Sequence, residues 1–253
     1  MHVVVTGASA GIGEAIARAF SARGHGVTLV ARRRPLLEAL AASLPGPSHV
    51  VEADLGDPAT CTAWLPAAEA ALGPVDVLVN NAGMQVIGPT AEVDIERAEL
   101  SLRLNLLSPL RLTHAVLPGM LARRQGCIVD VASMAALAPT PAMTWYNASK
   151  AGLAGASEAL RGELRGTGVH VVTVYPGIIE TDMGKAGLAA YQKSRMLALQ
   201  PRGTTEGLAA RVLKAVERRR ARVVYPAIYG MTRWLPPVTR WFMDRLTPPL
   251  AGH

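Results

Sequence analysis

The chain has 253 residues, half of them hydrophobic, and a formal net charge of +7. This length and apolar content suit one α/β domain whose sheet is covered on both faces. The basic residues are scattered without interleaved aromatic residues, which argues against a nucleic-acid-binding surface, and no apolar run approaches the ~20 residues of a membrane-spanning helix.

Seven short apolar runs alternate with helical stretches along the chain, at residues 2–6, 27–31, 49–52, 76–79, 127–131, 169–174 and 222–225. The runs are nearly continuous in apolar residues, as expected of strands buried on both faces. They predict a doubly wound, seven-stranded parallel sheet flanked by helices, in a single domain over residues 1–225. Because the first run starts at His2, and Cys61 and Cys127 give no disulfide framework, we expect a cytoplasmic protein without a secretory signal.

A glycine-rich turn follows the first strand. Residues 6–13 read Thr-Gly-Ala-Ser-Ala-Gly-Ile-Gly and open a helix. Such glycines let the backbone approach a pyrophosphate, and the free N–H groups of the helix N-terminus favour an anion. A turn of this kind is weak support alone, but between a strand and a helix it predicts a Rossmann-type dinucleotide site.

The second strand ends at Arg32, Arg33 and Arg34, where a fold selective for NAD normally carries an acidic residue. A guanidinium at this position can bind the 2′-phosphate of NADP through paired hydrogen bonds. Arg34 also fits a solvated turn. We therefore predict a preference for NADP(H), with NAD(H) not excluded.

Polar residues also follow the third and fourth strands. Asp54 suits either a hydrogen bond to the adenine amino group or the N-terminal cap of the next helix. Asn80 suits bracing of the strands, and residues 80–83 end the fourth strand. Ligands bind at the carboxyl ends of strands in open α/β sheets, so both segments belong to the same predicted site.

Ser133, Tyr146 and Lys150 form a pattern that suits proton transfer. If Tyr146 opens a helix, Lys150 lies one turn further along the same face, with its ammonium near the phenol oxygen. The usual pKa of a phenol is about 10, so a nearby cation would favour the phenolate near neutral pH. Ser133 would hold the substrate oxygen. Because Tyr-x-x-x-Lys also occurs by chance in helices, its meaning depends on the rest of the chain.

Two segments follow the sixth strand. Residues 177–204 lack clear periodicity, which is typical of a lid or a substrate loop. Residues 226–253 are rich in proline and aromatic residues, and we expect this extension to pack on the same domain. One face of a predicted short helix carries Trp234, Val238, Trp241 and Phe242. Alternatives to packing are contact with a greasy substrate, a second subunit or, over residues 234–242, a membrane interface.

These motifs together resemble the short-chain dehydrogenase/reductase family. The matching elements are the TGxxxGxG turn, Asn80-Asn81-Ala82-Gly83, Asn105, Ser133, Tyr146-Asn147-Ala148-Ser149-Lys150, Pro176-Gly177 and Thr181. The resemblance makes Tyr146 the general acid/base, and it implies that Lys150 lowers the phenol pKa and binds the nicotinamide ribose. Ser133 would position the substrate oxygen, and Asn105 would support a water chain to Lys150.

The resemblance also implies how the cofactor is held. Ala10 stands where some NADP-preferring members carry a basic residue, which leaves the 2′-phosphate to Arg32 or Arg33 and to Ser9. The expected cofactor contacts are Gly7, Ser9, Gly11, Ile12, Gly13, Arg32, Arg33, Asp54, Leu55, Asn81, Ala82, Gly83, Tyr146, Lys150, Pro176, Gly177, Ile179 and Thr181. No metal site is expected.

The sequence therefore predicts an NADP(H)-dependent oxidoreductase that interconverts an apolar ketone and a secondary alcohol. The alternatives are a 3-oxoacyl carrier-protein reductase, which usually ends soon after the seventh strand, and a non-catalytic NADP-binding redox sensor. We expect a homodimer or homotetramer formed through helices near residues 95–121 and 145–165. The predicted substrate pocket is lined by Met84, Gln85, Ala135, Leu137, Pro139, Trp145, Ile178 and residues 183–196.

Overall fold

A parallel sheet of seven strands forms the centre of the protein. The structure is a computed structural model, and it describes residues 1–194 and 198–251. The strand order is β3-β2-β1-β4-β5-β6-β9, which confirms the predicted doubly wound sheet. The strands are β1 (His2–Thr6), β2 (Gly26–Ala31), β3 (Ser48–Glu52), β4 (Val77–Asn80), β5 (Gly126–Val131), β6 (Val169–Pro176) and β9 (Arg222–Tyr225). The order reverses between β1 and β4, and such a switch point leaves a crevice at the carboxyl ends of the strands.

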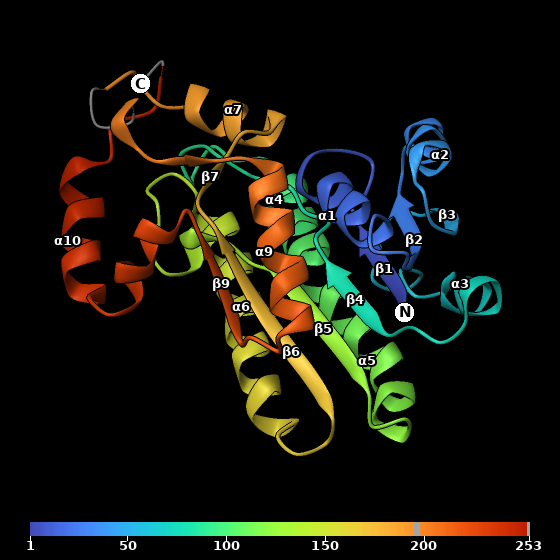
Figure 1. Cartoon of the computed structure of the whole chain (residues 1–253). Coiled ribbons are helices and arrows are strands. Elements are labelled where there is room, and N and C mark those ends of the chain that lie inside the picture. Colours follow the sequence, from blue (N-terminus) through green and yellow to red (C-terminus); the bar gives the residue numbers. More distant parts are fainter. Residues whose placement is uncertain (195–197, 252–253) are drawn as a thin grey trace.

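Helices cover both faces of this sheet (Figure 1). On one face lie α1 (Gly11–Ser21), α2 (Arg34–Ser43) and α9 (Thr205–Glu217), and on the other α3 (Leu65–Leu72), α5 (Ser108–Ala122) and α6 (Thr144–Glu163). Val3 and Val5 of β1 pack in the first layer, whereas Val4 between them packs in the second. The apolar runs are continuous because alternate side chains enter different cores.

A π-helical turn, η1 (Arg103–Leu107), joins α4 (Ile95–Leu102) to α5 and has the fully buried Asn105 at its centre. Turns of this type interrupt the α-helical spacing and are frequent at functional sites. The predicted continuous helix near residues 95–121 therefore consists of two α-helices with a wider turn between them.

The segment after β6 is more regular than the predicted loop over residues 177–204. It contains β7 (Ile178–Ile179), α7 (Asp182–Ala189) and β8 (Arg202–Gly203), with β7 and β8 paired in parallel. The Thr181 hydroxyl accepts a hydrogen bond of 3.0 Å from the Gly184 N–H and so caps α7. This capping starts a helix where the apolar pattern is too weak to indicate one. Residues 195–197 of the segment lie outside the described residues.

The C-terminal extension contains η3 (Ala227–Arg233) and α10 (Pro236–Leu246) and is tethered on both sides of α10. Before the helix, the Tyr229 hydroxyl donates to the carbonyl of Pro201 at 3.0 Å. After it, the Gln192 N–H donates to the carbonyl of Pro249 at 3.0 Å. The helix is fixed in place, yet the aromatic residues in it and just before it are not covered: Trp234, before the helix, is 84% exposed, and Trp241, within it, is 50% exposed.

No helix among the described residues is both long enough and apolar enough to cross a bilayer.

Candidate functional site

One large cavity, of about 920 Å³, opens at the carboxyl ends of β1, β2, β4, β5 and β6. It is bordered by the glycine-rich turn, by the start of α6, by α7 and by α10. Every predicted catalytic residue and cofactor contact lines this cavity except Gly13 and Asn105. The chain therefore brings the predicted nucleotide turn and the predicted proton-transfer residues into one space.

The glycine-rich turn leaves room for a dinucleotide. Gly7 and Gly11 adopt φ angles of 67° and 60°, a conformation that residues with a side chain rarely adopt. Gly13 lies beneath the turn, where a Cβ atom would collide with the carbonyl oxygen of Gly7. No side chain caps α1 at Ala10, so the first N–H groups of the helix are left for an anion. The residues present thus fit the pyrophosphate of a nicotinamide cofactor.

The arginines after β2 occupy different environments. The Arg33 guanidinium donates two hydrogen bonds to the Ser9 hydroxyl, from Nη2 at 2.8 Å and from Nε at 3.2 Å. Both Arg33 and Arg32 line the cavity. Arg34 instead pairs with Glu38 at 2.7 Å on the exposed side of α2. The contact with Ser9 holds the Arg33 guanidinium beside the glycine-rich turn, whereas Arg34 stays at the surface.

Asp54 lies in the cavity wall and shapes its own loop. Its Oδ1 atom accepts a hydrogen bond of 2.8 Å from the Gly56 N–H, which closes a tight turn. The alternative that Asp54 caps the next helix is wrong, because α3 begins at Leu65 and is preceded by Trp64. The neighbouring Leu55 also lines the cavity.

The two asparagines at the end of β4 brace the sheet beneath the site. The Asn81 side chain donates to the Thr6 carbonyl at 2.9 Å and so joins the ends of β4 and β1. The buried Asn80 amide donates to Asp130 at 2.8 Å and to Thr113 at 3.2 Å. Asn80 therefore links β4 to β5 and α5, and the predicted bracing role is what the structure shows.

Tyr146 stands in the first turn of α6 and is 6% exposed, within an apolar cluster that includes Ala135 and Met143. Burial raises the pKa of its phenol above the usual value, and interactions with the Ser133 and Gln85 side chains oppose this only in part. The phenol is therefore neutral at pH 7 and has a proton to donate.

Ser133 lies just after β5 and caps the N-terminus of the short helix η2 (Met134–Ala136). Its hydroxyl oxygen accepts a hydrogen bond of 3.1 Å from the Ala135 N–H. That bond uses an acceptor site and leaves the hydroxyl proton available, because a serine hydroxyl carries one donor and two acceptors. Ser133 can therefore donate to an oxygen in the cavity.

Lys150 lies one turn beyond Tyr146 and is 5% exposed. Its ammonium donates a hydrogen bond of 2.8 Å to the carbonyl of Val131. Burial lowers the pKa of Lys150 to about 8, and the negative charge of Asp130 opposes this shift. The ammonium is thus directed to the end of β5. That Lys150 lowers the pKa of the Tyr146 phenol stays a prediction.

Asn105 is fully buried and lies outside the residues that line the cavity. Its side chain accepts from the Met84 N–H at 2.9 Å and donates to the Met84 carbonyl at 2.9 Å and to the Ser149 hydroxyl at 3.0 Å. A Cβ atom at Gly83 would lie 3.0 Å from the Asn105 Oδ1 atom and 3.4 Å from the Lys150 Nζ atom. Asn105 thus fixes the loop after β4 against the helix that carries Tyr146 and Lys150.

The remainder of the cavity is mostly apolar. Met84, Gln85, Ala135, Ile178 and Met183 line it as predicted. The wall formed by the described residues does not include the following three predicted members: Leu137, Pro139 and Trp145. Successive helix residues point about 100° apart, so the neighbour of Tyr146 on α6 faces away from the cavity.

Sequence reasoning missed several lining residues near the end of the chain, among them Thr239, Met243 and Leu246. The available signal was the apolar spacing of the last helix. That spacing predicts an apolar face on the helix, but it does not show that a neighbouring face lines the cavity.

A model of the family described as short chain dehydrogenase matches residues 1–192. The chain belongs to this family. Its members are NAD(P)-dependent dehydrogenases and reductases, so the protein is an oxidoreductase with a nicotinamide cofactor.

Three relatives illustrate this membership. A short chain dehydrogenase of Pseudocercospora fijiensis is 36% identical over 189 residues, which is 72% of this chain and 60% of that protein. A fatty acyl-CoA reductase of Mycobacterium tuberculosis is 34% identical over 230 residues, covering 85% of this chain and 78% of that protein. The structure of a short-chain dehydrogenase from Sphingobium yanoikuyae in complex with NADPH has a TM-score of 0.80 and 30% identity, covering 97% of this chain and 96% of that chain.

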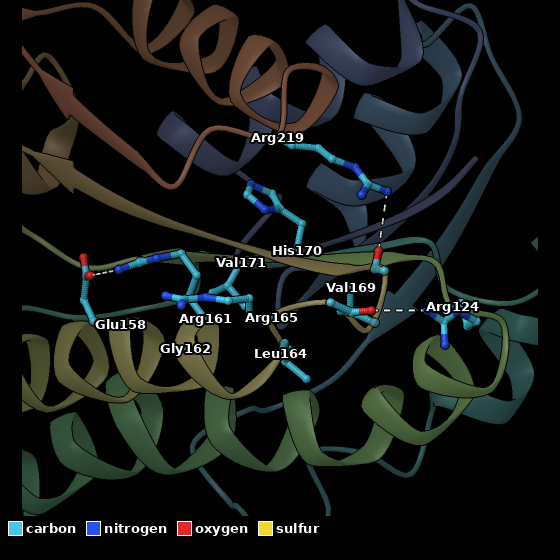
Figure 2. Close-up of a pocket in the computed structure, with 12 residues that line it drawn as sticks. Arg124, Glu158, Arg161, Gly162, Leu164, Arg165, Val169, His170, Val171 and Arg219 are labelled. Atoms are coloured by element: carbon cyan, nitrogen blue, oxygen red, sulfur yellow. Dashed lines mark hydrogen bonds and ion pairs between the residues drawn. The ribbon is translucent and has the colours of Figure 1, made fainter.

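This short-chain dehydrogenase has a second cavity, of about 730 Å³, near the start of β6 (Figure 2). Arg124 donates to the carbonyl of Gly166 at 3.2 Å, and Arg219 donates to the carbonyl of Gly168 at 3.4 Å. Arg161 pairs with Glu158. These guanidinium groups stabilise a turn and a carboxylate, and they do not form a proton-transfer set.

Proposed function

We propose that this protein is an NADP(H)-dependent carbonyl reductase that interconverts an apolar ketone and a secondary alcohol. The observation that carries the proposal is the presence of a buried, neutral Tyr146 in the same cavity as Ser133, Lys150 and the glycine-rich turn. NADPH, when bound, supplies the hydride that reaches the carbonyl carbon. The protein residues then need to orient the ketone and manage one proton.

Each residue has a distinct part in this reaction. Ser133 donates a hydrogen bond to the carbonyl oxygen and holds it beside Tyr146. As negative charge develops on that oxygen, the Tyr146 phenol transfers its proton to it. The Lys150 ammonium has two donors besides the one bound to Val131. These donors would bind the cofactor ribose and return a proton to the phenolate through water. Asn105 is a positioning residue for Lys150.

The contact between Arg33 and Ser9 supports a preference for NADPH. A guanidinium held at the edge of the glycine-rich turn matches a 2′-phosphate in both charge and geometry. The NADPH complex of the relative from Sphingobium yanoikuyae supports the same cofactor.

Replacing Arg33 with aspartate is expected to weaken NADPH binding roughly 10- to 100-fold, because a charged hydrogen bond is lost and like charges are introduced. NADH binding should change little, since NADH lacks the 2′-phosphate. Fluorescence titration with both cofactors measures the two affinities. The matched control is Arg34→Asp, which breaks only the surface pair with Glu38. Equal weakening of both cofactors in Arg33→Asp would show that Arg33 does not recognise the phosphate.

The apolar wall supports an apolar substrate, and the fatty acyl-CoA reductase among the relatives supports one with an acyl chain. The decisive test follows NADPH absorbance with ketones of increasing chain length. We expect kcat/KM to rise about fourfold for each added methylene until the cavity is filled, because each buried methylene contributes about 0.8 kcal/mol. Selective reduction of 3-oxoacyl carrier-protein would favour that alternative. NADPH binding without turnover across the panel would favour the redox sensor.

Exposed leucines support a homo-oligomer. Leu107, Leu110 and Leu121 lie along η1 and α5 and are each exposed by more than a third. A homodimer through α5 and α6 would cover them, and light scattering measures the resulting mass.

A further inference from the structure

The last helix presents one face to the cavity and a neighbouring face to solvent. Its cavity face carries Thr239, Phe242, Met243 and Leu246. Side chains three and four residues apart share a helix face, so these positions form one stripe. The adjacent stripe, with Trp234 just before the helix, consists of Trp234, Val238 and Trp241, which are 84%, 47% and 50% exposed.

The apolar surface extends beyond this stripe. Half of the large apolar side chains exposed among the described residues lie in the extension, namely Ile228, Met231, Trp234, Leu235, Val238, Trp241, Phe242 and Leu246. We call these eight residues the tail patch. Scattered single apolar residues are normal on a protein surface, but eight of them gathered in one short segment indicate a contact surface.

The charges around the tail patch are mainly positive. Within α10, Arg240 and Arg245 are exposed and Asp244 is the one acidic residue. The Arg245 guanidinium lies 5.0 Å from the centre of the Trp241 ring, so a cation borders the aromatic surface directly. Arginine beside exposed tryptophan is typical of helices that lie in the headgroup region of a membrane.

We propose that the tail patch docks on an anionic lipid surface and that a lipid-dissolved substrate enters the cavity behind α10. Figure 1 shows α10 outside the β9 edge of the sheet, at the periphery of the molecule. An 11-residue helix is roughly 16 Å long, about half the apolar thickness of a bilayer, so it would lie along the interface. Positive charge around the patch matches anionic headgroups, whereas a second copy of this chain would bring the same positive charges together.

The structure makes this docking compatible with an intact active site. The contacts of Tyr229 with Pro201 and of Gln192 with Pro249 hold α10 on both sides, so the patch does not need to unfold to reach lipid. The cavity wall and the tail patch belong to the same helix. A substrate leaving the lipid would therefore cross only the width of α10. This substrate route rests on the proposed reductase function, whereas the docking itself does not.

The docking test is sedimentation of the full-length protein with vesicles of phosphatidylcholine alone or with about one third phosphatidylserine. We expect binding to the anionic vesicles. The double variant Trp234→Ser with Trp241→Ser should bind about tenfold less tightly or worse. The double variant Arg240→Glu with Arg245→Glu should lose roughly fivefold in affinity for each arginine on anionic vesicles.

Matched controls carry equivalent changes on other surfaces. Leu36→Ser removes an exposed leucine of α2, and Arg218→Glu with Arg220→Glu reverses two exposed charges. Both controls should bind vesicles like the unaltered protein. Absence of vesicle binding, or equal binding by the tryptophan variant, would overturn the proposal. So would an oligomer in solution that the tryptophan variant dissociates, because the patch would then be a subunit interface.

The substrate route has a separate readout. With a long-chain ketone dissolved in anionic vesicles, the tryptophan variant should lose about tenfold in rate, in line with its weaker binding. With a short, water-soluble ketone it should retain the full rate, because neither tryptophan lines the cavity. Equal loss on both ketones would refute delivery through the patch. If no ketone is reduced while vesicle binding persists, docking stands and the reductase proposal fails.

Discussion

Replacing Tyr146 with phenylalanine is expected to lower kcat for ketone reduction by about 10²- to 10⁴-fold, the range that general acid catalysis contributes. In the proposed reaction the buried phenol donates the proton, and its raised pKa keeps it protonated near neutral pH. The substitution removes one oxygen and preserves the ring that packs against Ala135 and Met143. Unfolding temperature and NADPH affinity should therefore change little. Steady-state kinetics combined with cofactor titration separates these effects.

Tyr191→Phe is the matched control. Tyr191 lines the same cavity, and burial raises the pKa of its phenol to about 12. Its hydroxyl donates to the carbonyl of Pro141 at 2.7 Å, so its proton is committed to the backbone. This variant should keep kcat within a few-fold and lose stability of about 1 kcal/mol for the hydrogen bond. Full turnover by Tyr146→Phe, or equal losses in both variants, would rule out Tyr146 as the acid.

The second large effect concerns pH. Because burial lowers the pKa of Lys150 to about 8, its ammonium is present below that pH and is lost as the pH rises through it. The Tyr146 phenol, with its raised pKa, stays protonated over the same range. The rate of ketone reduction should therefore fall above about pH 8, and this alkaline decline reports on Lys150.

Asp130→Asn should move the alkaline decline to lower pH. The Asp130 carboxylate stabilises the Lys150 ammonium, and a nearby opposite charge typically shifts a pKa by about 1 to 3 units. Removing it should cost roughly tenfold in rate at pH 8, with much smaller loss near pH 6. Profiles of kcat against pH for both proteins measure the shift.

The same substitution should leave stability unchanged or improve it. Burial raises the pKa of Asp130, so keeping its carboxylate charged is costly. The buried Oδ1 atom of its neighbour Asn80 has no hydrogen-bond partner among the described residues, and the new amide could donate to it. Asp76→Asn is the control, since Asp76 precedes β4 at the opposite end of the sheet. An unchanged alkaline decline in Asp130→Asn would mean that Asp130 carries no charge.

Strand positions and the nucleotide turn could be predicted because local pattern determines them. Valine-rich runs are buried on both faces wherever they occur in a parallel sheet, and the runs at β1 and β9 match their predicted bounds. The glycine-rich turn depends on backbone conformation at Gly7 and Gly11, which glycine itself signals. The candidate site followed from these elements, since strand ends meet at one edge.

The remaining features depend on contacts between distant residues. Tyr146 and Lys150 have the predicted helical spacing, but the direction of the ammonium is set by Val131 on β5. The π-helical turn around Asn105 is stabilised by Met84 and Ser149, neither of which is near it in sequence. The exposure of the last helix depends on where its tethers place it. The spacing of residues along the chain does not reveal these contacts.

Gly177, just after β6, leaves a slot that the Tyr229 ring fills, and this contact has a consequence for protein engineering. A Cβ atom at this position would collide with the Tyr229 ring, so the glycine and the tyrosine must be kept together. A chimaera joined after Tyr229 would keep that fit and exchange the outer helix as a cassette. A junction before Tyr229 would remove the tyrosine and leave the slot empty. The contacts of Tyr229 with Gly177 and Pro201, which hold the chain before α10, would then be lost. Transplanting outer helices between relatives is thus a route to new substrate preferences on an unchanged catalytic base.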